Sequence, residues 1–194
     1  MGSMLNRANR ATVKAAVEAL APAPGEVGAD IGFGGGLGLA LLLNRVGPTG
    51  RVHGLEISRV MLDRARRQHR RALAEGRLEL HEVSMTNLPI ADVSVDAAIS
   101  VNTIYFVGDE AFAGLARMLS RTGRLVLGLG DPAAMAREPV TVHGFRIRPL
   151  AQVLTLLSAA GLTLVDHHRV GSGPDAFHLV VAQPTPDWRP RPPN

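Results

Sequence analysis

The 194-residue chain is predicted to be an α/β protein, with a doubly wound, mostly parallel seven-stranded sheet, one antiparallel strand in the edge region and helices on both faces. Short apolar runs alternate along the chain with longer stretches of helical periodicity. The run at 95–101 is almost wholly apolar, as a strand buried on both faces must be. Two final apolar runs are joined by a link too short for a helical crossover, which predicts the antiparallel strand.

Composition indicates one globular domain that needs no disulfide. Hydrophobic residues make up 46% of the chain, which is enough to bury a core at this length. The absence of cysteine excludes disulfides, thiolate nucleophiles and thiolate metal sites, and no metal site is predicted. The apolar runs are too short to cross a bilayer, so a cytoplasmic protein without membrane contact is expected.

The two ends of the chain differ in composition from its middle. Residues 1–24 predict a helical extension, which is ended by a segment rich in proline and is placed either to cover a ligand or to pack on the sheet. Residues 25–183 are predicted to form the main domain. Five prolines fall within 184–194, which predicts a disordered tail that contains Trp188.

The densest glycine pattern follows the first predicted strand. Residues 27–31 read as a buried strand and 37–45 as a helix, and five glycines lie within the seven residues 32–38. Glycine tolerates positive φ and lets the backbone approach a ligand that a Cβ would push away. The turn is therefore predicted to be a ligand cradle.

Two common nucleotide-binding motifs do not fit this turn. A dinucleotide fingerprint requires glycine or alanine where Leu37 stands, and a Walker A loop requires a lysine that is missing here. The remaining pattern is Asp30, one residue, then G-x-G-G-G, with a second acid at Glu56, 26 residues after Asp30 and just beyond a strand at 52–55. An acid at the end of the second strand of such a fold accepts hydrogen bonds from ribose hydroxyls.

These residues resemble the nucleotide site of class I S-adenosylmethionine-dependent methyltransferases, which have a Rossmann-like fold. The resemblance implies S-adenosyl-L-methionine as the cofactor, S-adenosyl-L-homocysteine as the product, and methyl transfer by in-line displacement. The positions that it implicates in cofactor binding are Asp30, Gly32, Phe33, Gly34, Gly36, Glu56, Ile57, Ser84, Met85 and Asn102.

A basic helix is predicted after the second strand, with Ser58 as its N-cap. Seven arginines in 59–77 face only Asp63 and Glu75, a charge excess that also suits an RNA or other nucleic-acid methyltransferase. However, apolar residues at helical spacing leave the arginines on a solvated side, and stacking aromatics are scarce. Nucleic acid is therefore an unlikely partner, and His69, on the apolar stripe, is interpreted as structural.

The middle of the chain continues the alternation of strands and helices. Strands are predicted at 77–83, 95–101 and 123–129, and a helix at 109–119. Residues 88–96 resemble the segment that leads into the fourth strand of many small-molecule methyltransferases. Ser84 stands where the family places an acid that contacts the adenine amino group, and a hydroxyl also accepts that bond, more weakly.

The C-terminal part predicts one helix and two strands. A helix begins near Leu150 and is closed by Gly161, and strands at 162–170 and 176–182 are joined as a hairpin. Residues 131–148 are the least patterned internal segment. Together with the N-terminal helix they are predicted to close the acceptor pocket.

Catalysis by this family requires alignment more than reactive groups. Methyl transfer from a sulfonium needs no metal or covalent intermediate, and a base matters only if the acceptor binds protonated. Polar candidates near the ends of the fourth and fifth strands are Asn102, Tyr105, Asp131 and His143, of which Tyr105 and His143 are the predicted catalytic residues.

A small organic molecule is the predicted acceptor. Methyltransferases acting on nucleic-acid amino groups or protein glutamine resemble one another in an Asn/Asp-Pro-Pro-Tyr motif after the fourth strand, where this chain has Ser100, Val101, Asn102 and Thr103. RNA cytosine C5 methylation uses cysteine, which is missing. The alternatives are a nucleic-acid methyltransferase, a nicotinamide-dependent oxidoreductase and a non-catalytic cofactor-binding homologue.

Overall fold

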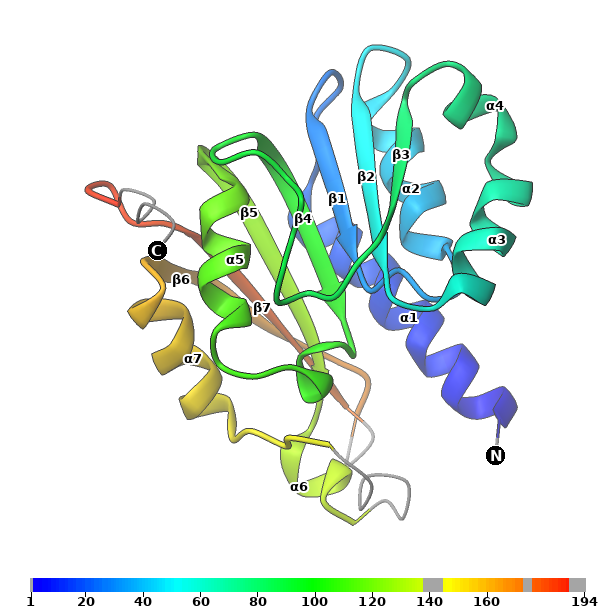
Figure 1. Cartoon of the computed structure of the whole chain (residues 1–194). Helices are drawn as coiled ribbons and strands as arrows, with labels where there is room; N and C mark the ends of the chain where they lie inside the picture. Colours follow the sequence, from blue (N-terminus) through cyan, green and yellow to red (C-terminus); the bar gives the residue numbers. More distant parts are fainter. Residues whose placement is uncertain (1, 138–144, 173–175, 189–194) are drawn as a thin grey trace.

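A computed structural model describes residues 2–137, 145–172 and 176–188, and it contains a seven-stranded sheet with the strand order β3-β2-β1-β4-β5-β7-β6 (Figure 1). β7 is antiparallel to both of its neighbours, β5 and β6, whereas the other pairs are parallel. The predicted fold class is thus confirmed. The strands are β1 (Val27–Ile31), β2 (Arg51–Glu56), β3 (Leu78–Glu82), β4 (Val95–Val101), β5 (Leu119–Gly130), β6 (Leu162–Val170) and β7 (Phe177–Pro184).

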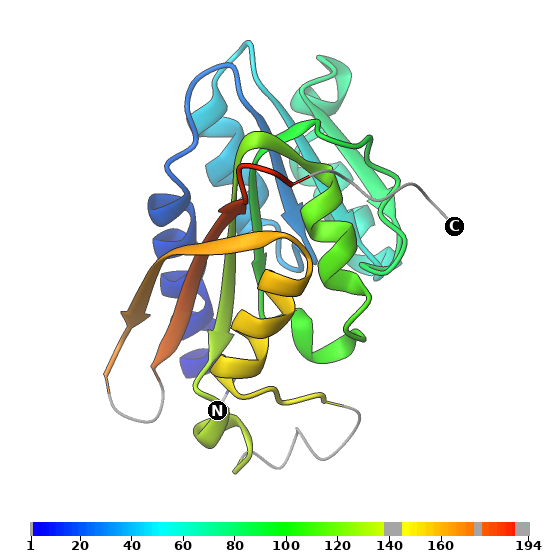
Figure 2. The ribbon, with the colours of Figure 1, turned by 90° about the vertical axis from the view of Figure 1, so that its left-hand side faces the viewer.

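Helices cover both faces of the sheet, as a doubly wound fold requires (Figures 1 and 2). α1 and α2 lie behind the sheet in Figure 1, whereas α5 and α7 lie in front of it. The helices are α1 (Gly2–Leu20), α2 (Leu37–Val46), α3 (Arg59–Gln68), α4 (Arg70–Ala74), the 3₁₀ helix η1 (Ile104–Phe106), α5 (Ala111–Met118), α6 (Pro132–Met135) and α7 (Leu150–Ala159). None of the described helices has the length and hydropathy that crossing a membrane requires.

Alternating side chains of each strand divide the core into two layers. Val52 of β2 belongs to the cluster that contains Leu39 of α2, whereas Leu55 belongs to the cluster that contains Phe112 of α5. Because β1, β2, β4 and β5 run parallel, their carboxyl ends lie at one edge of the sheet, at the bottom of Figure 1. That edge is where open α/β sheets bind ligands.

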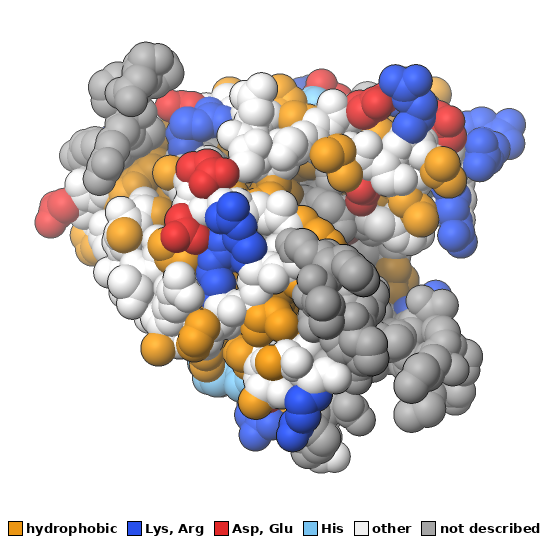
Figure 3. Space-filling model, turned by 60° about the horizontal axis from the view of Figure 1, so that its bottom comes forward, with side chains coloured by type: hydrophobic (Ala, Val, Ile, Leu, Met, Phe, Trp, Pro, Cys, Tyr) orange, Lys and Arg blue, Asp and Glu red, His pale blue; other side chains and the backbone are white. Residues whose placement is uncertain are grey.

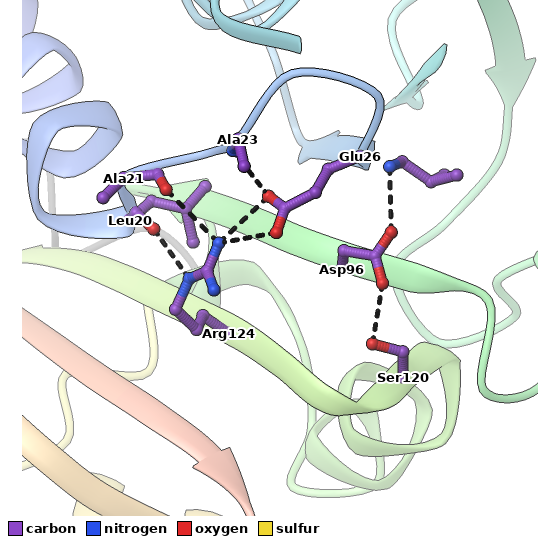
Figure 4. Close-up of polar contacts among 8 residues, drawn as sticks. Leu20, Ala21, Ala23, Glu26, Asp96, Ser120 and Arg124 are labelled. Carbon is purple, nitrogen blue, oxygen red and sulfur yellow. Dashed lines mark hydrogen bonds and ion pairs between the residues drawn. The ribbon is translucent and has the colours of Figure 1, made fainter. Parts of the chain in front are cut away.

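Polar contacts join the chain segments at the opposite end of the sheet (Figure 4). The guanidinium of Arg124 donates to the carbonyl of Leu20 (2.8 Å) and to both carboxylate oxygens of Glu26 (3.1 and 3.0 Å). Asp96 accepts from the Val27 amide (3.0 Å) and from a serine hydroxyl of β5. These bonds fix the end of α1 and the start of β1 against β4 and β5.

The structure differs from the sequence prediction at several boundaries. The predicted basic helix is divided at His69, whose φ of −114° and ψ of 28° are not helical. The fifth strand begins at Leu119 rather than residue 123, because Leu119 pairs with Val95 before a register shift. Trp188, assigned to the disordered tail, instead packs against the core and donates its indole N–H to the Ala160 carbonyl (3.0 Å).

Candidate functional site

The glycine-rich turn at the end of β1 leaves open space beside its backbone. Gly32, Gly34 and Gly36 all have positive φ (72°, 48° and 79°). A Cβ at Gly34 or Gly35 would meet nothing within 4 Å, whereas a Cβ at Gly32 would overlap the Thr103 side chain. Gly34 and Gly35 therefore border free space, while Gly32 is required by packing.

This turn forms one wall of a cleft of about 320 Å³. The N-terminal helix α1 forms another wall. The backbone of Asn102 has a φ of 59°, and its side-chain amide donates to Asn9 Oδ1 of α1 (3.2 Å). The cleft is lined by Asn9, Arg10, Val13, Asp30, Gly32, Phe33, Gly34, Gly35, Leu37, Gly38, Arg64 and Val101. α1 is thus positioned over the glycines. Arg10 of α1 and Arg64 of α3 both line this cleft.

Asp30 is a buried carboxyl group in the cleft wall. Burial, helped by the nearby charge of Glu56, raises the pKa of Asp30 to about 8, against a backbone hydrogen bond from Leu39 that lowers it. A Cβ at Gly38 would overlap the Asp30 carboxylate, so glycine there makes room for this acid. The raised pKa favours the protonated form of Asp30, and a cation in the cleft would favour its ionised form.

Glu56 connects the end of β2 to the glycine-rich turn. Its Oε2 accepts from the Gly34 amide (2.9 Å), and its Oε1 accepts from the amides of Ile57 (2.9 Å) and Ser58 (3.0 Å). Ser58 occupies the predicted N-cap position of α3, but its hydroxyl makes no capping bond, and its own amide donates to Glu56. A carboxylate has about four acceptor positions, so Glu56 still has capacity for a ligand hydroxyl.

The other predicted cofactor positions differ in what they expose. Ile57 is 71% exposed beside Glu56, so an apolar surface is free next to the acid. Phe33 and Met85 are buried in the two core clusters, which leaves mainly their backbone to face a ligand. The Ser84 hydroxyl is paired with Thr86 Oγ1 (3.0 Å).

Tyr105 lies next to the ends of β4 and β5, but its environment does not favour a role as a general base. Its hydroxyl is buried and accepts from the Gly130 amide (2.6 Å). Burial raises the pKa of Tyr105 to about 12, so the phenol stays protonated at neutral pH. This geometry favours a role in fixing the end of β5. His143, the other predicted catalytic residue, lies outside the described residues.

Aromatic rings gather next to this strand end. Phe145 stacks on Tyr105 (5.8 Å between centroids) and meets Phe106 edge-on (4.7 Å), and Phe106 is 63% exposed. Arg148 anchors the segment because its buried guanidinium donates to Asp109 (2.8 Å) and to the Ile104 carbonyl (2.6 Å). In Figure 3, which brings the carboxyl ends of the strands forward, hydrophobic side chains surface between charged groups.

A polar chain beside these rings was not predicted. His178 of β7 lies between Asp131 (Nε2 to Oδ2, 3.5 Å) and His167 of β6 (Nδ1 to Nε2, 2.8 Å). A hydrogen bond from the Ala134 amide, with further help from His178, lowers the pKa of Asp131. The sequence indicates Asp131 from its place after the fifth strand, but Asp131 meets His178 only through the pairing of β5 with β7, and His178 meets His167 only through the pairing of β6 with β7.

The basic segment carries several ion pairs with nearby acids. Arg66 pairs with Asp63 (2.7 Å), and both Arg71 (2.6 Å) and Arg77 (3.0 Å) pair with Glu75. Leu62, Ala65 and Ala72 face the core, as the spacing predicted. Local pairing reduces the positive charge available to a phosphate backbone. Arg64 has a different position, since it lines the glycine-rich cleft.

Comparison with known proteins identifies a family and a fold. Residues 29–127, about half of the chain, match the family described as "Methyltransferase domain". The chain is 36% identical over 117 residues to an uncharacterized 37.1 kDa protein in transposon TN4556 of Streptomyces fradiae, covering 59% of this chain and 33% of that protein. It is 32% identical over 109 residues to an arsenite methyltransferase of Halobacterium salinarum, covering 55% and 28%. The chain thus spans about a third of the length of these relatives.

A solved structure shares the architecture. The crystal structure of a SAM-dependent methyltransferase from Aquifex aeolicus superposes with a TM-score of 0.72 and 18% sequence identity, covering 88% of each chain. At this identity the likeness shows the fold.

Proposed function

Because the chain belongs to the class I S-adenosylmethionine-dependent methyltransferases, we propose that it transfers the cofactor's methyl group to a small organic acceptor. The observation that carries the proposal is the open space beside Gly34 and Gly35, with Glu56 hydrogen-bonded to the same turn. When bound, S-adenosylmethionine supplies a methyl group on a sulfonium, which a nucleophile removes in one in-line displacement.

The residues of the cleft fit this cofactor. Asp30 and Glu56 place two acids near one turn, which suits a ligand that carries a positive sulfonium and ribose hydroxyls. Arg10 and Arg64 line the same cleft and suit a carboxylate. Ile57 offers an uncovered apolar side chain for a flat base next to Glu56.

The other proposed contacts come from the backbone and from one amide side chain. Gly32, Gly34 and Gly36 shape the turn, and Phe33, Ser84 and Met85 contribute mainly main-chain groups, because their side chains are buried or paired. Asn102 joins α1 to the end of β4 and so helps to exclude water from the cleft.

The acceptor is proposed to bind where β4 and β5 end. Phe106 and Phe145 offer an apolar contact surface there, which favours an organic acceptor over a nucleic-acid backbone. Arsenite is disfavoured, because a soft metalloid prefers thiolates and this chain has no cysteine. Catalysis is proposed to rest on alignment, since the Tyr105 hydroxyl already accepts a bond from Gly130.

The cradle is tested by a matched pair of glycine substitutions. Gly34 and Gly47 both have positive φ, and a Cβ at either would meet nothing within 4 Å, but only Gly34 lines the cleft. Valine strains the backbone at either position because φ is positive, and Gly47 is the stricter control because its ψ of −164° is almost exclusive to glycine. Titration calorimetry with S-adenosylhomocysteine is expected to show binding to the wild type and to Gly47→Val, and none to Gly34→Val.

Equal affinity in both variants would remove the turn from the cofactor site. Loss of folding in Gly34→Val alone, seen by circular dichroism, would mean that the turn is needed for structure rather than for binding. Binding of NADH in place of S-adenosylhomocysteine would support the oxidoreductase alternative.

A further inference from the structure

Three side chains of ligand type meet on β2 and β3, outside the glycine-rich cleft. His53 pairs with Glu79 in the parallel register, and Glu79 and His81 alternate on β3, so all three share one face of the sheet. His53 Nδ1 lies 3.2 Å from His81 Nε2. Of the two Glu79 carboxylate oxygens, Oε2 lies 3.6 Å from His53 Nδ1 and Oε1 lies 3.8 Å from His81 Nε2.

The three residues lie in a cleft that solvent can reach. They occupy the Leu55 side of β2, and no described helix is drawn over this part of the sheet in Figure 1. The cleft measures about 310 Å³, and the connection between β3 and β4 forms part of its wall. The side chains of His53 and His81 are 20% and 14% exposed, so both rings are held largely by the protein.

We propose that His53, Glu79 and His81 bind a divalent transition-metal ion, with Zn²⁺ as the best fit and a fourth position open to water. Ligand atoms around tetrahedral Zn²⁺ lie about 3.3–3.5 Å apart, given bond lengths of about 2.0–2.1 Å. The 3.2 Å between the two imidazole nitrogens is close to this spacing, and one ligand atom from each of the three residues can be chosen so that all lie within 4.8 Å of one another. Adjacent ligands of octahedral Mg²⁺ lie closer, at about 2.9 Å, and Mg²⁺ prefers oxygen ligands.

The chemistry of the donor set points the same way. Two imidazoles with one carboxylate are three of the four ligands found in several Zn²⁺ sites, and a water commonly completes them. Arg51 and Arg77 line the same cleft, where their positive charges would oppose a cation. The charge of Arg77 is partly neutralised by its pair with Glu75 (3.0 Å).

The alternative to a metal site is a single proton shared between the His53 and His81 rings. The experiment below separates these two interpretations.

A metal ion here would cross-link β3, the edge strand, to β2. β2 ends at Glu56, three residues after His53, so the ion would hold the strand that supplies the proposed ribose acid. Because the ion binds the folded chain, it should raise the melting temperature, and the rise should grow with the logarithm of the free Zn²⁺ concentration once this exceeds Kd.

The test uses the full chain without a polyhistidine tag, stripped with chelator and dialysed. Calorimetric titration is expected to show one Zn²⁺ per chain and no Mg²⁺ binding, and Co²⁺ is expected to give the absorption bands of a tetrahedral site. Removing a residue that only hydrogen-bonds to a metal ligand typically weakens metal binding by about 10–100-fold. His81→Ala removes a ligand itself, so it should weaken Zn²⁺ binding by more than this. Glu79→Gln, a change at a 66% exposed side chain, provides a second variant if His81→Ala folds poorly.

His168→Ala is the matched control, because its imidazole also lies near a carboxylate (Nε2 to Asp166 Oδ2, 3.0 Å) but on β6. This control should bind Zn²⁺ like the wild type. The proposal is overturned if the wild type binds no stoichiometric Zn²⁺, which leaves the shared-proton pair. It is equally overturned if His81→Ala and Glu79→Gln bind like the wild type, or if His168→Ala loses as much affinity as they do.

Discussion

Asp30 is the residue whose ionisation the fold changes most clearly. It lies near the end of β1 and lines the glycine-rich cleft, where glycine at position 38 leaves room for its carboxyl group. Burial raises the pKa of this acid from 3.8 to about 8, so the folded state keeps a proton that the unfolded chain has already lost above about pH 4. Between these pH values the unfolded state binds fewer protons than the native state, and the free energy of unfolding falls as the pH rises.

Asp30→Asn is expected to remove this pH dependence. An amide cannot ionise but still offers an oxygen to the Leu39 amide, so the variant should gain stability relative to the wild type as the pH rises. The expected difference in slope is up to about 1.4 kcal/mol per pH unit within this window. Urea denaturation of both proteins from pH 4.5 to 7.5, without ligand, measures it, and titrating groups that do not interact with Asp30 cancel in the comparison. Parallel stability profiles would show that Asp30 ionises normally in the folded protein.

Tyr105 illustrates how one residue changes its interpretation once its partners are known. The sequence placed this tyrosine at the end of the fourth strand, where a base for the acceptor is plausible. In the structure its hydroxyl accepts from Gly130, and burial raises the pKa of the phenol to about 12. These surroundings favour a role for Tyr105 in holding the ends of β4 and β5 together. Asp131 and His178 form a polar pair next to the end of β5.

At the scale of elements, α6 and Phe145 lie at the end of the sheet where the acceptor is proposed to bind. Met135 of α6 packs against the core beside Gly130, and Phe145 packs on Tyr105 and Phe106. Arg148 holds the far end of this segment through Asp109. The proposed acceptor surface and the glycine-rich cleft are therefore built largely from different elements.

Alanine at Met135 and Phe145 is expected to raise the acceptor KM by about tenfold or more, because lost apolar contacts in a pocket are worth about 1–3 kcal/mol. S-adenosylhomocysteine affinity should change only a few-fold, since neither side chain lines the glycine-rich cleft. Steady-state kinetics with an acceptor found by radiolabelled methyl transfer, and calorimetry with the product, measure the two effects. Leu164→Ala, at an exposed position of β6, is the control. If the double variant lost product binding as well, this division between elements would be wrong.

At the scale of the whole molecule, the net charge of +4 does not by itself identify a nucleic-acid partner. Much of it lies on α3 and α4, where ion pairs such as Arg66 with Asp63 and Arg71 with Glu75 neutralise part of the surface. Exposed pairs of this kind contribute little to stability, so their removal should leave the fold intact.

Arg66→Glu combined with Arg70→Glu is therefore expected to leave methyl transfer within about twofold of the wild type, with little dependence on salt. Activity measured between low and moderate salt concentrations checks this, with circular dichroism to confirm folding. A large loss of activity, together with a steep salt dependence in the wild type, would instead favour a nucleic-acid acceptor, because neutralised phosphates release counterions.

Local patterns in the sequence determined most of the fold. The strands at 27–31, 95–101 and 162–170 lie where the sequence placed them, and Gly161 ends α7 with a φ of 87°. Apolar periodicity and glycine report the conformation of the adjacent backbone, which depends on near neighbours. The glycine-rich turn and Glu56 were recognised together for the same reason, since each ends a readily identified strand.

Only the tertiary structure decided which distant side chains meet. The Asn9–Asn102 contact, the stacking of Phe145 on Tyr105 and the place of Trp188 all join residues far apart in the chain. The cluster of His53, Glu79 and His81 depends on one residue of register between β2 and β3. Strand order and register arise from the packing of the whole sheet, and a shift by one residue turns every side chain to the other face. Backbone conformation was thus readable from the sequence, whereas these side-chain contacts required the assembled fold.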